Sequence, residues 1–173
     1  MEAVSQGFAV PALGENLAVK VGDPAPDFTI ESKTGEKVSL SQFHGLKNVV
    51  LYFYPKDETM GCTREACGFR DRYEAFTDLG ALVVGVSSDS PESHRKFAEH
   101  HQLPFILLSD PRKAVRKLYG VPSNMGFLPG RVTYVIDKSG MVRHIFNSQM
   151  HPEEHVNEAL RILTTIEAPL VND

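Results

Sequence analysis

The chain has 173 residues, of which 42% are hydrophobic, 23% charged and 9% aromatic. This composition is typical of one soluble globular domain with its own core, and it excludes disorder over most of the chain. Lysine and arginine total 18 against 22 aspartates and glutamates, giving a net charge of −4. So mild a balance predicts neither a nucleic-acid partner nor attraction to an anionic membrane.

Hydropathy and cysteine usage limit the cellular setting. The longest apolar runs have about six or seven residues, whereas a membrane-spanning helix needs about 20. The opening Met1-Glu2 is followed by neither a basic segment nor the apolar stretch of a signal peptide. We therefore expect a cytoplasmic protein. Cys62 and Cys67 are too few for a disulfide scaffold, and in a reducing compartment such a pair suggests redox or metal chemistry.

Residues 1–20 show no sustained periodicity and contain Pro11, Gly14 and Asn16. We expect them to form a weakly ordered lead-in without an assigned function. Residues 21–173 contain no internal repeat or low-complexity linker. They are therefore expected to form a single domain.

Short runs rich in β-forming residues predict a central sheet. They lie at 48–54, 81–86, 105–108 and 132–136 and are mostly apolar, as expected for strands buried on both faces. Strand and helix alternate three times, which predicts parallel pairing through right-handed crossovers. The turn residues at 137–140 lead into a further strand at 141–146, so the last two strands are predicted to form an antiparallel hairpin.

Apolar residues spaced three and four apart predict the helices between these strands. The first helix begins near Cys62 and continues through Tyr73 to Phe76. Ser90-Pro91 and Asp110-Pro111 are each expected to supply the N-cap and first residue of a helix. A last helix is predicted from Pro152 to about Leu163. The pattern predicts an α/β domain with a mixed sheet.

The chemistry is concentrated at 54–71 (YPKDETMGCTREACGFRD), where a buried strand ends and a helix begins. Open α/β sheets place their sites at this edge. With Thr59 as N-cap, Cys62 lies in the first turn among unpaired backbone N–H groups and the positive end of the helix dipole. This position favours a nucleophilic thiolate, although a cysteine at a helix start taken alone is more often an inert small hydrophobe.

The two cysteines have different surroundings in this helix. Cys62 continues the apolar stripe, whereas Cys67 lies about 140° around the helix on the polar side. Residues five apart in an intact α-helix have Cα atoms about 8.6 Å apart, beyond the roughly 7 Å that a disulfide bridges. A bond between the two cysteines would therefore require this turn to unwind.

These residues resemble a known family. Pro55, Thr59 and Cys62 match the P-x-x-x-T-x-x-C signature of peroxiredoxins, and Cys67, five residues on, resembles the Q type, also called bacterioferritin comigratory protein. Residues 21–28 (VGDPAPDF) are similar to the opening of the family, and 126–137 (GFLPGRVTYVID) to its arginine-bearing segment. The resemblance extends from about residue 21 to 163. It implies a thioredoxin-like fold, with a central mixed sheet flanked by helices on both faces.

The resemblance also implies roles for individual residues. Cys62 would be the peroxidatic cysteine that attacks the O–O bond of a peroxide, with Thr59 and Arg131 holding the substrate. Pro55 would cover the sulfur, and Glu65 would orient the arginine. Gly61 and the Cys62 backbone would help to bind the substrate. Apart from the resemblance, the apolar residues Met125, Phe127 and Leu128 of the loop at 122–129 are expected either to form a lip for the substrate or to pack as core.

The implied cycle is a thiol-dependent peroxidase reaction on hydrogen peroxide and small organic hydroperoxides. Attack leaves Cys62 as a sulfenic acid, which Cys67 would resolve as a disulfide. Thioredoxin or a related dithiol protein would reduce that disulfide. The family implies a monomer, and it implies neither a metal nor an organic cofactor.

This chain departs from the family at two positions. Met60 replaces a common proline and Gly68 a common aspartate, and both changes are expected to weaken the turn that must unwind.

Other readings remain open. The chain could be a thiol–disulfide oxidoreductase, although it lacks a C-x-x-C pair, or a non-catalytic redox-sensing or chaperone-like binding module. Thr59 could be only a cap, Arg131 a solvated surface charge and Cys67 a bystander. Residues 151–155 (HPEEH) match a zinc-peptidase string. Because Pro152 is expected to begin a helix and leave His151 outside it, this string is not expected to bind zinc.

Overall fold

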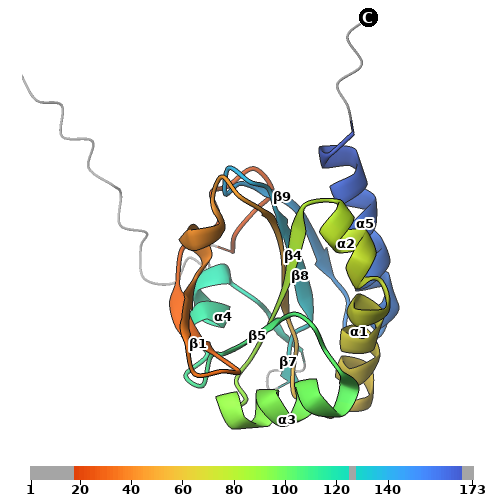
Figure 1. The fold of residues 1–173 in the computed structure, drawn as a ribbon. Coiled ribbons are helices and arrows are strands. Elements are labelled where there is room, and N and C mark those ends of the chain that lie inside the picture. The colour runs from red at the N-terminus through yellow and green to blue at the C-terminus, as the bar shows by residue number, and fades with distance from the viewer. Residues whose placement is uncertain (1–17, 125–127, 169–173) are drawn as a thin grey trace, which may run out of the picture.

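The computed structural model describes residues 18–124 and 128–168. A seven-stranded sheet in the order β2-β1-β5-β4-β3-β8-β9 forms its centre (Figure 1). Its strands are β1 (Thr29–Ser32), β2 (Lys37–Ser39), β3 (Asn48–Phe53), β4 (Ala81–Ser87), β5 (Ile106–Ser109), β8 (Val132–Ile136) and β9 (Val142–Asn147). A separate two-stranded ladder pairs β6 (Ser123–Asn124) with β7 (Leu128–Pro129).

Both parallel and antiparallel pairs occur, which confirms the predicted mixed sheet. β3, β4 and β5 are parallel neighbours. β8 runs antiparallel to β3, with Val132 opposite Phe53, and forms the predicted hairpin with β9. β1 and β2 were not predicted, because they are short, polar segments that lie at one edge of the sheet.

The helices cover both faces of the sheet (Figure 1). One face carries α1 (Met60–Asp71), α2 (Tyr73–Asp78), α3 (Pro91–His101) and α5 (Pro152–Ile166), whose apolar residues pack on the same side of the strands as Val50 and Tyr52. The other face carries α4 (Ala114–Tyr119) and the 3₁₀ helix η1 (Leu40–Phe43), packed against Leu51 and Phe53. This is the α/β arrangement that the sequence predicts.

Two predicted helices differ in the structure. The first breaks at Arg72, whose backbone (φ −109°, ψ 14°) leaves the helical region before α2 begins. α4 begins at Ala114, after Lys113 in the left-handed conformation (φ 57°), and not at Pro111. Asp110 still supplies the cap across this turn, because its carboxylate accepts from the backbone N–H groups of Val115 and Arg116 at 3.2 and 3.0 Å.

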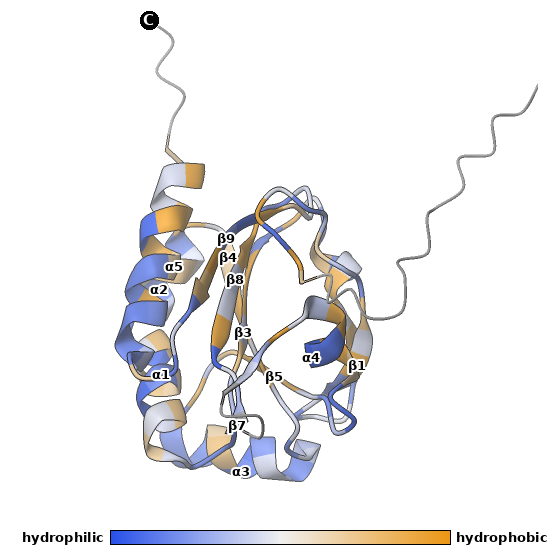
Figure 2. Cartoon of the chain, turned by 180° about the vertical axis from the view of Figure 1, so that it is seen from behind, coloured by the Kyte–Doolittle hydropathy of each residue, from blue (hydrophilic) through white to orange (hydrophobic). Residues whose placement is uncertain are grey.

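The helices display both hydrophilic and hydrophobic residues, as expected when one side of each is buried (Figure 2). Within 18–124 and 128–168, no helix is both long and apolar enough to span a bilayer. Most of the predicted lead-in, residues 1–17, lies outside the described residues.

Candidate active site

Cys62 is the third residue of α1, directly after the loop that leaves β3. Its side chain is 1% exposed, in line with its predicted place on the apolar stripe. The sulfur accepts a hydrogen bond from Nη2 of Arg131 at 3.3 Å. The thiol therefore combines two features that favour a thiolate, the start of a helix and a neighbouring guanidinium.

Strand pairing explains how Arg131, 69 residues further along the chain, reaches Cys62. Arg131 directly precedes β8, and β8 runs antiparallel to β3. The first residue of β8 therefore lies beside Phe53 at the end of β3, where the chain turns toward α1. Arg131 is 4% exposed, which rules out a solvated surface charge.

Glu65 lies three residues after Cys62 on α1 and is fully buried. Its Oε1 accepts from Nη1 of Arg131 at 2.7 Å, so one guanidinium bridges the carboxylate and the sulfur. Burial raises the pKa of Glu65 to about 8, against the lowering effect of Arg131. Burial lowers the pKa of Arg131, but the charges of Glu65 and Cys62 outweigh this effect and leave it above its usual value. Arg131 therefore remains a cation beside the sulfur.

Gly61 leaves the space that the guanidinium occupies. A Cβ added to Gly61 would lie 3.0 Å from Nη2 of Arg131, closer than side chains normally pack. The small residue before Cys62 thus allows the arginine to approach the helix backbone closely.

Thr59 is the N-cap residue of α1 by its backbone (φ −80°, ψ 152°), but its hydroxyl is used differently from the prediction. The hydroxyl donates to the carbonyl of Lys56 at 2.8 Å, and among the described residues it accepts no capping N–H. Since its proton is engaged, its free lone pairs would accept from a bound hydroxyl or hydroperoxide group. Pro55, half-buried, follows β3 by two residues and begins the loop to α1.

Cys67 is half-buried on the same helix, and both cysteines are free thiols. Because α1 is unbroken from Met60 to Asp71, helix geometry separates the two Cα atoms by about 8.6 Å. The structure is therefore a reduced state in which a direct disulfide is out of reach. The predicted requirement for unwinding stands.

Sequence reasoning missed His155 as part of this site. The residue is fully buried, its Nε2 faces the carbonyl of Ser148 at 2.7 Å and its Nδ1 faces the hydroxyl of Thr133 at 2.8 Å. Because a carbonyl can only accept, Nε2 carries the proton and Nδ1 accepts from Thr133. Both ring nitrogens are thus occupied. His151 is exposed outside α5, so the HPEEH string does not assemble a zinc site.

Arg116 is a second buried residue that sequence reasoning missed. Its guanidinium donates to the carbonyl of Gly130 at 2.8 Å and to that of Tyr54 at 3.0 Å. These two residues directly precede Arg131 and Pro55. Arg116 therefore connects the two chain segments that supply the site. The sequence placed Arg116 on a predicted helix but carried no signal for these contacts.

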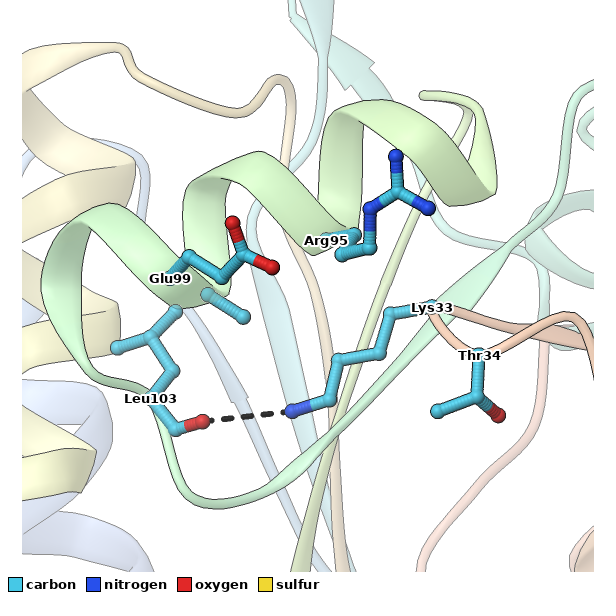
Figure 3. A pocket seen from close by; sticks show the side chains of 6 residues that line it. Lys33, Thr34, Arg95, Glu99 and Leu103 are labelled. Carbon is cyan, nitrogen blue, oxygen red and sulfur yellow. Dashed lines mark hydrogen bonds between the residues drawn. The ribbon is translucent and has the colours of Figure 1, made fainter.

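The predicted apolar lip is not described, because Met125 and Phe127 lie outside the described residues. Their contribution to substrate binding stays a prediction. A pocket elsewhere, between the β1–β2 turn and α3, is lined by Lys33, Thr34, Arg95, Ala98, Glu99 and Leu103 (Figure 3). It contains none of the predicted site residues.

A buried helix-start thiol held by a guanidinium, on a mixed α/β sheet, defines a thiol-based redox enzyme. The family model described as AhpC/TSA family matches residues 21–145. Peroxiredoxin Q, chloroplastic, of Sedum lineare is 53% identical over 161 residues, covering 91% of this chain and 86% of that protein. The relative of the same name in Arabidopsis thaliana is 53% identical over 146 residues, covering 84% and 67%.

Solved structures agree. Peroxidoxin BcpB of Mycobacterium tuberculosis matches with a TM-score of 0.79 and 37% identity over 85% of this chain and 97% of that one. The bacterioferritin comigratory protein of Xanthomonas campestris, described for its alkyl peroxide reduction activity, matches with a TM-score of 0.76 and 27% identity over 81% and 92%. The chain belongs to the AhpC/TSA family, in its peroxiredoxin Q group, and has the thioredoxin-like fold of that family. It is a thiol peroxidase.

The expected cytoplasmic location is wrong. The relatives from Sedum lineare, Populus jackii, Triticum aestivum and Arabidopsis thaliana are all named as chloroplastic proteins, which points to a plastid location. Composition and cysteine content could not distinguish a plastid from the cytoplasm, because neither carries information on targeting.

Proposed function

We propose that Cys62 is the peroxidatic cysteine of a peroxidase acting on hydrogen peroxide and small organic hydroperoxides. The observation that carries this proposal is the 3.3 Å hydrogen bond from Arg131 to the buried sulfur in the first turn of α1. The thiolate attacks one peroxide oxygen, the O–O bond breaks, and Cys62 becomes a sulfenic acid. The other oxygen leaves as water or an alcohol after taking up a proton.

The surrounding residues favour the transition state of this step. Arg131 stabilises the thiolate and the charge that develops on the leaving oxygen, because a guanidinium offers several directed donors. Glu65 holds the guanidinium in place through its Oε1. Thr59 binds the peroxide through its hydroxyl lone pairs, and Gly61 with the Cys62 backbone completes the pocket. Pro55 shields the sulfur from above.

Cys67 then acts as the resolving cysteine. After the first turns of α1 unwind, its thiol attacks the Cys62 sulfur, an S–S bond forms and the sulfenic hydroxyl leaves as water. A dithiol protein such as thioredoxin reduces this disulfide and is itself oxidised. Since both cysteines lie on one helix, closure needs no second chain, which supports a monomer as the working unit. We take residues 21–173 as one domain because both cores share one sheet.

Peroxide consumption with a thioredoxin system tests the proposal. Cys62→Ser is expected to abolish the reaction with peroxide. Cys67→Ser is expected to keep the first oxidation but to stall recycling. Equal recycling in the Cys67 variant would remove that residue from the mechanism. Many equivalents consumed per chain distinguish an enzyme from a sensor that reacts once, and activity on protein disulfides without peroxide would favour an oxidoreductase.

A further inference from the structure

A cluster of two histidines and one carboxylate lies outside the peroxidase site. Nδ1 of His100 is 3.0 Å from Oε1 of Glu58, and Nε2 of His101 is 3.0 Å from Oε2 of the same carboxylate. The three ligand atoms all lie within 4.8 Å of one another. Nothing in the peroxidase reaction uses these side chains.

We propose that Glu58, His100 and His101 form a binding site for a divalent transition-metal ion of the zinc class. Two imidazoles and one carboxylate are a ligand set that zinc uses, with a fourth position left to water. Bonds of about 2.0–2.2 Å around a tetrahedral ion place neighbouring ligand atoms about 3.3 Å apart. The carboxylate oxygens already lie close to that distance from each ring nitrogen.

The part of the fold that carries the histidines is held in place. His100 and His101 are the last residues of α3, and Gln102 ends the helix in the left-handed conformation (φ 52°). Directly beyond it, the Lys33 ammonium donates to the carbonyl of Leu103 at 3.3 Å (Figure 3) and to that of Phe105 at 2.9 Å. A rigid support lowers the entropy that ordering the ligands costs.

Glu58 is held as well. Its backbone adopts φ 62°, a conformation that a residue with a side chain rarely takes and that the surrounding structure must hold in place. Its neighbour Asp57 is buried, with its backbone N–H on Asp89 and its carboxylate on Tyr54, Ser93 and His94. The loop thus presents the Glu58 carboxylate to α3. His100 is mostly exposed, so an ion can enter from solvent.

A metal ion bound at this cluster is expected to affect the unwinding of α1 that disulfide formation requires. This expectation rests on the proposed function. Glu58 precedes α1 by two residues, and Arg70 near the end of α1 donates to the His101 carbonyl at 2.7 Å. The contacts with the end of α3 therefore bracket the segment from Cys62 to Cys67 that must unwind. An ion joining Glu58 to α3 is expected to slow that unwinding.

Calorimetric titration with Zn²⁺ tests the site itself. The full chain carrying Cys62→Ser and Cys67→Ser is used, because thiols would also bind zinc. We expect one ion per chain, with an affinity at least about 10-fold weaker after His100→Ala or Glu58→Gln. His151→Ala, which alters an exposed histidine outside the cluster, should leave binding unchanged. Absence of saturable zinc binding overturns the proposal. So does an affinity in the His100→Ala and Glu58→Gln variants equal to that of the chain with an unaltered cluster.

A second measurement tests the effect on unwinding. The chain with both cysteines is oxidised with one equivalent of peroxide, and disulfide formation is followed with and without Zn²⁺. We expect zinc to slow formation of the Cys62–Cys67 disulfide several-fold in the wild type. In His100→Ala, the slowing that depends on the cluster should disappear. If zinc slows disulfide formation equally in the wild type and in His100→Ala, the slowing comes from zinc bound to the thiols. That result overturns the proposed effect of the cluster on unwinding. The titration result stands apart from this outcome, since it needs no peroxidase activity.

Discussion

Glu65 and His155 face each other in the interior, with Oε2 and Nδ1 3.6 Å apart and neither side chain exposed. Within the described part of the chain, this Glu65 oxygen lacks a hydrogen-bond partner, while the other oxygen holds Arg131. The carboxylate that positions the arginine is therefore itself sensitive to protonation.

Glu65→Gln should gain stability relative to wild type as the pH rises. The folded-state pKa of Glu65 is raised to about 8 from 4.5. The stability that the buried, protonated Glu65 contributes is therefore full below pH 4.5 and is lost as the pH rises through 8. Glutamine keeps the shape and cannot ionise. Urea unfolding of both proteins at pH 5 and pH 8.5 measures the difference. An equal difference at the two pH values would show that Arg131 keeps Glu65 ionised throughout.

Acid should destabilise the wild type through His155. Burial lowers the pKa of His155 to about 4, so the stability it contributes is present above pH 6.5 and lost as the pH falls toward 4. The change from 6.5 to about 4 corresponds to about 3 kcal/mol. His155→Gln should flatten this part of the stability curve, while His151→Ala should keep it. Parallel curves for wild type and His155→Gln would contradict the prediction.

Arg131→Lys should slow the oxidation of Cys62 by peroxide about 100-fold or more. A single ammonium cannot reproduce the fork that reaches both the sulfur and Glu65. Quenched-flow alkylation measures this step without a reductant, and it suits a chain that has no tryptophan. A loss below about threefold would mean that charge alone suffices.

Gly61→Ala should slow the same step about 10-fold, because the new methyl group pushes the guanidinium away from the sulfur by a few tenths of an ångström. Stability should not fall, since alanine is favoured over glycine in a helix by about 1 kcal/mol. An unchanged rate with unchanged stability would show that the arginine tolerates displacement.

Met60→Pro should slow closure of the Cys62–Cys67 disulfide about two- to fivefold, because proline at the first helical position stiffens the turn that must open. The site accepts proline. Met60 is 74% exposed, and the preceding Thr59 already has the extended backbone that proline requires. The rate of the initial peroxide reaction serves as the internal control. Unchanged closure would remove Met60 from the unwinding step.

The sequence predicted the sheet apart from β1 and β2, together with its mixed pairing and the inward position of Cys62. Apolar periodicity reports on burial, and turn residues mark where strands end. The pairing of β8 with β3 could not be predicted in this way. No local pattern tells which strand lies beside which, so the approach of Arg131 to Cys62 was expected only from the resemblance to a family. His155 was missed because its burial depends on how α5 packs over β8, and the surrounding HPEEH letters resembled an exposed helix start.

Phe69, two residues beyond Cys67, stacks on Tyr52 of β3 with ring centroids 4.7 Å apart. The far half of α1 is thereby fastened to the sheet, whereas its first turn has the solvent-facing Met60. Unwinding between Cys62 and Cys67 would therefore open the first turns of α1 while its last turn stays packed on the sheet. Because one part of α1 opens while the other stays packed on the sheet, the helix would have a fixed end from which to re-form after each turnover.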